Sequence, residues 1–101
     1  MNNKWADYLI SAVRYDIART HIDSVQVHQD NGVSVGSPTI WKRSQVVAAI
    51  ANSYTFVTIY LENNTWKKGE DVRAFRVGSN LYLRTDRNNR ASDNLGNLPE
   101  F

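Results

Sequence analysis

The chain has 101 residues, of which 42% are hydrophobic and 22% are charged, and its formal net charge at pH 7 is +2. This length accommodates one domain with a single core and excludes a second catalytic domain, and the composition is that of a folded protein. The absence of cysteine excludes disulfides and thiolate metal sites, and it agrees with the cytoplasm, where we expect the protein. No apolar run approaches the roughly 20 residues that span a bilayer, so we expect no membrane association.

The opening of the chain predicts a β-hairpin. Residues 8–15 and 20–28 are rich in β-branched and aromatic types, with turn-forming residues between them. Ile22 has the opposite parity to Val25 and Val27 along the second strand. Either both faces of this strand are partly buried, or a bulge reverses the alternation.

A loop and a helix are expected next. Residues 29–42 contain two turn signals and predict a long surface loop that Ile40 and Trp41 anchor, with a functional loop as the alternative. The following segment has apolar residues at helical spacing and lacks Gly and Pro. It predicts one short helix that ends near Asn52, with Ser44 or a neighbour as its N-cap.

Residues 54–61 predict a central strand, because apolar and aromatic residues occupy both of its faces. The last hairpin admits two registers. A two-residue loop at 78–79 would pair Phe75 with Tyr82 and would place Arg73 opposite Arg84. We prefer a three-residue loop at 78–80, which separates an apolar face from a polar face. The apolar face would then hold Phe75, Val77, Leu81 and Leu83, and the polar face Arg76, Tyr82 and Arg84.

The C-terminal stretch 86–101 is polar and aperiodic, yet it carries Leu95, Leu98 and Phe101. This pattern predicts an extended arm that docks along a sheet edge or over the core. The whole chain 1–101 is therefore interpreted as one small α+β domain. Its expected element order is β-β-α-β-β-β, with a mostly antiparallel, twisted sheet and one helix packed on a face.

Several segments, spread over nearly the whole chain, carry a resemblance to a known family. They are YLISAVRY at 8–15, HID at 21–23, QVVAAI at 45–50, WKKG at 66–69, RTD at 84–86, DNL at 93–95 and LPEF at 98–101. With these segments the chain resembles the bacterial domain of unknown function 3892 family. The resemblance implies a domain identity but no reaction, ligand or partner.

The most specific candidate surface is the face of Arg76, Tyr82 and Arg84. Two guanidinium groups beside a phenol can bind a carboxylate, a phosphate or a stacked base, and Arg14 could extend the set. Nearby aspartates could equally pair these arginines within the fold. Trp41 is a candidate stacking platform for a ligand, although packing at the rim of the core is the simpler explanation.

A doubled His-x-Asp pattern, at 21–23 and at 28–30, suits metal ligands or a general base held by a carboxylate. On a regular strand the two pairs lie on opposite faces, so the four groups do not converge. We therefore expect no metal site and no cofactor. His21 is kept as a candidate binding residue because it lies in the family-like segment.

No nucleophile motif, phosphate-binding glycine loop or metalloprotease motif is present, so no catalytic residue is predicted. The leading hypothesis is a non-catalytic binding or accessory module that recognises a macromolecular partner, either another protein or a second copy of the chain. The alternative is a nucleic-acid-binding domain that uses the Arg-Tyr-Arg face. A small hydrolase or ribonuclease-like enzyme is third.

Overall fold

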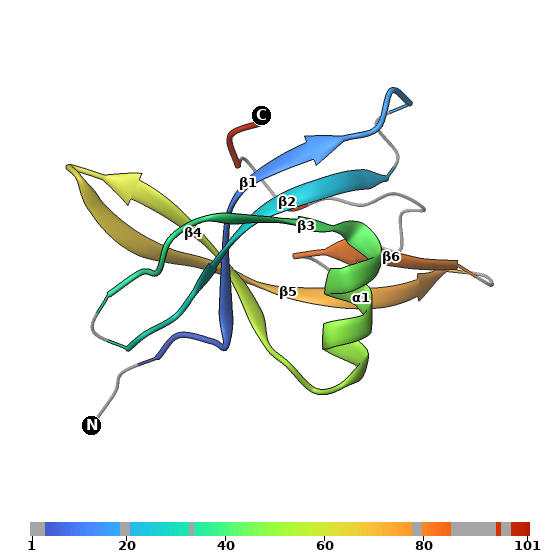
Figure 1. Cartoon of the computed structure of the whole chain (residues 1–101). Coiled ribbons are helices and arrows are strands. Elements are labelled where there is room, and N and C mark those ends of the chain that lie inside the picture. The colour runs from blue at the N-terminus through green and yellow to red at the C-terminus, as the bar shows by residue number, and fades with distance from the viewer. Residues whose placement is uncertain (1–3, 19–20, 33, 78–79, 86–94, 96–97) are drawn as a thin grey trace.

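The computed structural model describes residues 4–18, 21–32, 34–77, 80–85, 95 and 98–101. Within these residues it contains one helix and six strands: β1 (Tyr8–Tyr15), β2 (Ile22–Gln29), β3 (Thr39–Lys42), α1 (Arg43–Ala51), β4 (Phe56–Glu62), β5 (Thr65–Val77) and β6 (Asn80–Arg84). The strands form one sheet in the order β3-β2-β1-β4-β5-β6, in which β1 and β4 are parallel and the other neighbours are antiparallel. Helix α1 lies against one face of this twisted sheet (Figure 1). The α+β class is confirmed, but the element order is β-β-β-α-β-β-β.

The additional strand is β3, which the sequence analysis assigned to a loop. It pairs with β2 from Ser24 to Val27 and forms one edge of the sheet. Trp41 packs against the core, as expected of an anchor, whereas Ile40 is 58% exposed and is not one. Strand β3 has only four residues, directly after Pro38. This is too short to show the alternation of apolar and polar residues from which a strand is predicted.

The expected opening hairpin is confirmed as β1 and β2, and a bulge resolves its parity conflict. Arg14 pairs with Ser24 while Tyr15 pairs with Ile22, so Asp23 is an extra residue in β2. Ile22 is therefore turned toward the same core as the valines that follow it, and only 2% of it is exposed.

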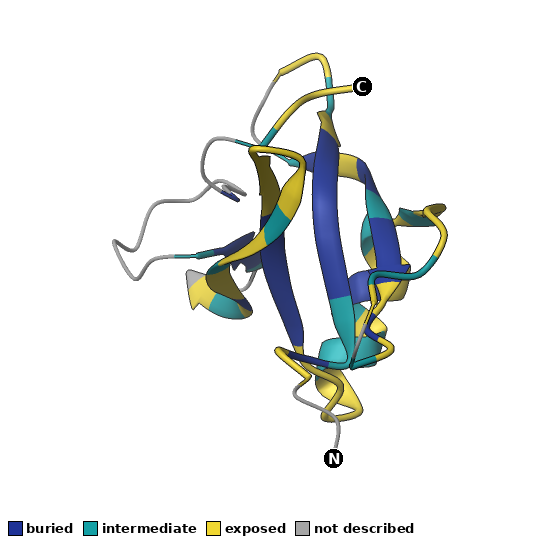
Figure 2. Ribbon diagram, turned by 90° about the vertical axis from the view of Figure 1, so that its left-hand side faces the viewer, coloured by how far each residue is buried: buried dark blue, intermediate teal, exposed yellow. Residues whose placement is uncertain are grey.

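Two apolar clusters lie on the two faces of the sheet. The helix-side core consists of ten buried residues: Ile10, Val13, Ile22, Val25, Val27, Val46, Phe56, Val72, Leu83 and Leu95. The smaller pocket-side cluster consists of Ala6, Leu9, Val57 and Ile59, with Val35 and Trp66 packed against it. Figure 2 shows that burial is concentrated along the middle of the strands, while the hairpin ends are exposed.

Helix α1 is confirmed as the short helix that packs on the helix-side core, where Val46 is fully buried. Its N-cap is Lys42 and not Ser44, which lies inside the first turn. The side-chain oxygen of Gln45 accepts a hydrogen bond from the Lys42 backbone N–H at 2.8 Å. Gln45 thus satisfies a backbone donor that has no partner within the helix. The helix ends at Ala51 with Asn52 as its C-cap, close to the expected end.

The β4–β5 hairpin projects from the body of the sheet (Figure 1). Its turn residues Asn63 and Asn64 have φ angles of 53° and 63°, which suits a two-residue hairpin turn. Near the body of the sheet, β5 approaches β4 so closely that a Cβ on Gly69 would lie 2.3 Å from the Thr58 Oγ1 atom. Glycine is therefore required where β5 bulges past Thr58.

The preferred register of the last hairpin is wrong. Phe75 pairs with Tyr82 and Arg73 with Arg84, which leaves residues 78–79 between the paired ends. Both faces of β6 are covered: Leu83 is fully buried in the helix-side core, and Tyr82 on the other face is only 6% exposed. The premise that one face must be polar therefore failed.

The described part of the C-terminal arm contacts the sheet. Leu95 is 2% exposed within the helix-side core, and Leu98 packs against that core. Glu100 forms a parallel bridge with Val13 of β1, while Phe101 remains 38% exposed. The rest of the predicted arm, residues 86–94 and 96–97, lies outside the described residues.

Candidate functional site

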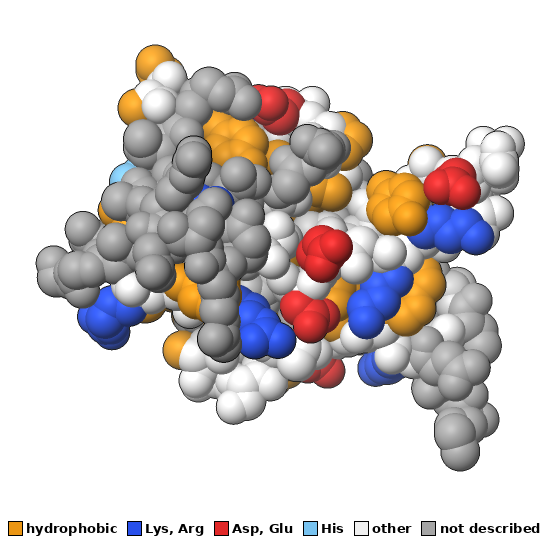
Figure 3. All heavy atoms as spheres, turned by 180° about the vertical axis from the view of Figure 1, so that it is seen from behind, with side chains coloured by type: hydrophobic (Ala, Val, Ile, Leu, Met, Phe, Trp, Pro, Cys, Tyr) orange, Lys and Arg blue, Asp and Glu red, His pale blue; other side chains and the backbone are white. Residues whose placement is uncertain are grey.

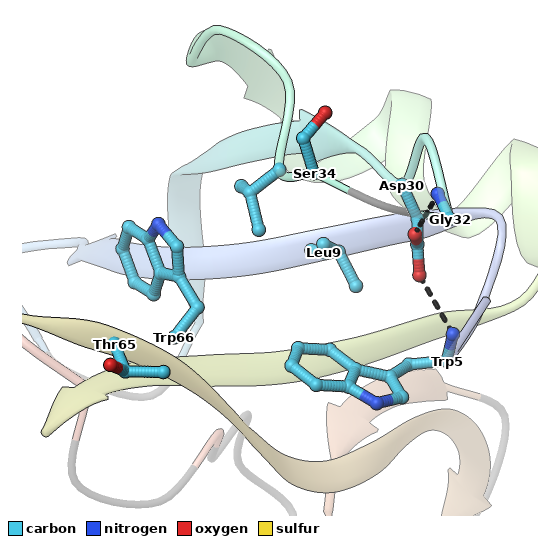
Figure 4. A pocket seen from close by; sticks show the side chains of 8 residues that line it. Trp5, Leu9, Asp30, Gly32, Ser34, Thr65 and Trp66 are labelled. Atoms are coloured by element: carbon cyan, nitrogen blue, oxygen red, sulfur yellow. Dashed lines mark hydrogen bonds between the residues drawn. The ribbon is translucent and has the colours of Figure 1, made fainter. Parts of the chain in front are cut away.

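A pocket of about 390 Å³ opens beside the pocket-side cluster. Its lining comes from four separated parts of the chain: Trp5, Leu9, the residues Asp30, Gly32, Ser34 and Val35 that follow β2, and Thr65 with Trp66 at the start of β5. In Figure 4 the indole rings of Trp5 and Trp66 lie on different sides of the space, with Leu9 between them. We call it the two-tryptophan pocket.

Asp30 fixes the position of Trp5. One carboxylate oxygen accepts hydrogen bonds from the backbone N–H groups of Trp5 at 2.7 Å and Ala6 at 3.4 Å. The other oxygen accepts from the Gly32 N–H at 2.8 Å, where a φ of 84° turns the chain. Asp30 is only 5% exposed, so this side chain ties the segment before β1 to the loop after β2 (Figure 4).

Among the described residues, no cation pairs with the Asp30 carboxylate. Its hydrogen-bond donors in the described parts of the chain are backbone N–H groups, without a lysine or arginine. The N–H groups stabilise the carboxylate without neutralising it. The pocket therefore has a negative charge at its edge and two indole rings around it.

His28 supports the opposite wall. Its ring lies 5.5 Å from the Trp66 ring, between centroids, at an interplanar angle of 57°. Nδ1 is 2.8 Å from the carbonyl oxygen of Gly36, and Nε2 is 2.7 Å from the Ser11 hydroxyl. A carbonyl only accepts, so we assign a proton to Nδ1, which donates to Gly36. His28 thereby joins β1, the β2–β3 loop and Trp66.

The Ser11–His28 contact has the spacing of a nucleophile and its base, but not the access that a reaction needs. Ser11 is 8% exposed and His28 is 5% exposed, and neither side chain lines the two-tryptophan pocket. A catalytic pair must reach the substrate atom it attacks. We interpret the contact as structural support for the pocket.

The Arg76, Tyr82 and Arg84 surface is not formed. Because Arg73 pairs with Arg84 and no bulge separates Arg73 from Arg76, the side chains of Arg76 and Arg84 lie on opposite faces of the hairpin. Arg76 is exposed, whereas Arg84 is only 2% exposed. The face visible in Figure 3 shows acidic and basic side chains interspersed, without a continuous basic strip among the described residues.

The remaining predicted residues lie in different places. His21 stacks on Tyr82 with 5.4 Å between ring centroids, and its Nδ1 is 3.8 Å from a carboxylate oxygen of Asp16. Arg14 contacts the end of the arm. Trp41 packs against Tyr8, with 4.8 Å between centroids, at the rim of the helix-side core. The structure thus brings His21 and Tyr82 together but does not bring them to Arg14 or Trp41.

Sequence reasoning missed the two-tryptophan pocket. It considered Asp30 as part of the His-x-Asp pattern, and it named neither Trp5 nor Trp66 as a candidate site residue. The parity argument placed residues 28 and 30 on one face of a regular strand. In the structure β2 ends at Gln29, and His28 and Asp30 both support the pocket. Nothing in the sequence indicated that residues 5, 30 and 66 meet.

The described residues contain no group of three or more histidine, aspartate or glutamate side chains that could hold a metal ion. In the same part of the chain, no helix has the length and apolar character needed to cross a bilayer. Comparisons with protein-family models, with curated proteins and with solved structures give no match. The site must therefore be interpreted from its own chemistry.

Proposed function

We propose that the chain is a small non-catalytic recognition module that binds a protein partner through the two-tryptophan pocket. The observation that carries this proposal is an open pocket between two indoles, one of them 39% exposed, beside a buried carboxylate that lacks a cationic partner among the described residues. Tryptophan is the residue type most enriched at the energetic centres of protein interfaces.

The lining of the pocket favours a long cationic side chain of the partner, arginine or lysine. The indole faces and the Asp30 carboxylate attract positive charge, while Leu9 and Val35 suit an aliphatic stem. A volume of about 390 Å³ is at the small end of ligand pockets, which run from roughly 300 to 1,000 Å³. It has room for a long side chain.

The surface beside the pocket is also apolar. Leu61 pairs with Trp66 across the β4–β5 hairpin and is 58% exposed. Beyond Thr58, β4 no longer pairs with β1, so one edge of this hairpin is free of strand partners among the described residues. A partner that inserts a side chain into the pocket can therefore also contact Leu61.

The nucleic-acid alternative has lost the surface on which it rested, because Arg76 and Arg84 do not share a face. We further propose membership of the domain of unknown function 3892 family, which the resembling segments on β1, α1 and β5 support. The absence of cysteine supports the proposed cytoplasmic location.

The three tryptophans allow a direct test by ¹H–¹⁵N NMR, because each contributes one indole N–H signal. N-acetyl-arginine methylamide should shift the Trp5 and Trp66 signals in a saturable way and leave the Trp41 signal unchanged. The neutral isostere N-acetyl-citrulline methylamide should bind at least several-fold more weakly. Equal binding of both probes would contradict the cationic assignment, and no shift of either indole would contradict the pocket itself.

A further inference from the structure

The two neighbours of β1 differ in length. Strand β2 pairs along the whole of β1, but β4 pairs only with Tyr8, Leu9 and Ile10. The second half of β1 therefore presents a sheet edge on that side, and the C-terminal arm occupies it. The Val13 N–H donates to the Pro99 carbonyl at 2.9 Å, and the Phe101 N–H donates to the Val13 carbonyl at 3.1 Å. The arm is thus joined to β1 by a single parallel bridge at Glu100.

Side chains add specificity to this backbone pairing. The Nε–H of Arg14 donates to the Phe101 carbonyl at 2.9 Å, and its guanidinium carbon lies 4.8 Å from the centroid of the Phe101 ring. Leu95 is buried in the helix-side core, and Leu98 packs against it. The acceptor thus recognises an extended backbone, two leucines and a terminal aromatic ring, as peptide-binding sheet edges do.

The stretch of chain between β6 and Leu95 is long enough for residues 95–101 to bind to another molecule. Ten residues separate Arg84 from Leu95, and ten residues can span up to about 35 Å when extended. The shortest dimension of the molecule is 23 Å. Exchange of an identical segment between two copies replaces each contact with the same contact, so it costs little beyond association.

We propose that the β1 edge at Val13 and Arg14 is a strand-acceptor site that takes residues 95–101 of a second copy of this chain. Two copies would exchange arms reciprocally and form a dimer. Where a segment and its acceptor are joined within one chain by a short connection, their effective concentration is in the millimolar range, so exchange should become extensive at roughly 1 mM protein. The acceptor is separate from the two-tryptophan pocket, and the two proposals can fail independently.

The first experiment uses full-length chains. Equal amounts of ¹³C,¹⁵N-labelled and unlabelled protein are refolded together from denaturant, once dilute and once at about 1 mM. Light scattering should show monomer in the dilute sample and a substantial dimer fraction in the concentrated one. Isotope-filtered NOEs should connect the Phe101 ring of one chain with Arg14 of the other. A monomer at both concentrations, or a dimer without these cross-chain NOEs, would overturn the proposal.

A second experiment supplies the segment as a peptide, which separates recognition from dimer formation. The Phe101→Ala chain should show a changed Val13 amide signal, and the peptide LGNLPEF should restore the wild-type signal. The matched peptide LGNLPEA should bind at least several-fold more weakly. Adding Arg14→Ala to the chain should abolish the difference between the peptides, whereas Arg76→Ala, an exposed change on β5, should preserve it. Equal binding of both peptides to the Phe101→Ala chain would contradict recognition of the aromatic ring.

Discussion

The two faces of the sheet are closed by different means. The helix-side core is sealed by ten buried apolar residues from five strands, the helix and Leu95. The pocket-side cluster has four buried apolar residues and relies on the polar side chains of Ser11, His28 and Asp30 to hold its surroundings. Apolar packing is non-directional and fills space, whereas hydrogen bonds fix groups at set distances.

The difference suggests how the two-tryptophan pocket is held open. On the helix side, apolar side chains pack against one another without such directional supports. On the pocket side, Asp30 fixes the backbone at Trp5, and His28 supports Trp66. These fixed supports keep the two indoles apart, so stability should depend mainly on the first face and binding on the second.

The largest loss of stability should follow a truncation in the helix-side core. Phe56 is 2% exposed, and its ring centroid lies 5.3 Å from that of Tyr8 and 5.8 Å from that of Trp41. Phe56→Ala should lower the free energy of unfolding by about 3–5 kcal/mol, measured by urea denaturation. Tyr60→Ala, at a position 44% exposed on the same strand, should cost less than about 1 kcal/mol. Similar losses for the two variants would contradict this view of the core.

A smaller loss is expected where the two strands approach most closely. In Gly69→Ala the new methyl group would meet the Thr58 Oγ1 atom at 2.3 Å and the Thr58 carbonyl oxygen at 2.9 Å. The resulting displacement should cost about 1–3 kcal/mol. Adding Thr58→Ala removes the first clash but leaves the second, so a double-mutant cycle should show partial rescue. Additive losses would indicate that the side-chain clash does not limit this approach.

The polar supports of the pocket are tested by Ser11→Ala. This change leaves Nε2 of the buried His28 without its partner and should cost about 1–2 kcal/mol. Ser24→Ala is the matched control, because Ser24 is also buried but its hydroxyl donates to Asp23, which is exposed and can bind water instead. We expect the control to cost roughly half as much or less in thermal denaturation. The Trp66 indole signal should change in Ser11→Ala and stay unchanged in Ser24→Ala.

The smallest effect on stability should come from Trp5→Ala, because Trp5 is 39% exposed. We expect a change below about 1 kcal/mol in the free energy of unfolding, together with loss of the shift that N-acetyl-arginine methylamide causes at Trp66. Together, the two results would show that Trp5 contributes to binding but little to stability. A variant that unfolds as readily as Phe56→Ala would show instead that Trp5 is a core residue.

Particular residues show how much of the fold could be predicted from the sequence. Regular periodicity identified β1, β2, α1 and β4 within about two residues. It failed for β3, which is short, and for the β5–β6 register, because we assumed that one face of β6 would be polar. Tyr82 is covered by His21, a contact between segments about sixty residues apart that the local pattern does not contain.

Composition and local patterning determined the α+β class, the single helix, the bulge alternative at Ile22 and the apolar character of Leu95, since these depend on residues close together in the chain. The tertiary structure alone decided the two-tryptophan pocket and the acceptor edge of β1. Trp5, Asp30 and Trp66 meet because β1 pairs with both β2 and β4, and β4 carries β5 beside them. The acceptor edge exists because β4 leaves β1 after Ile10. The order of the strands and the point at which β4 separates from β1 depend on the packing of the whole sheet. They therefore cannot be predicted from any single segment of the sequence.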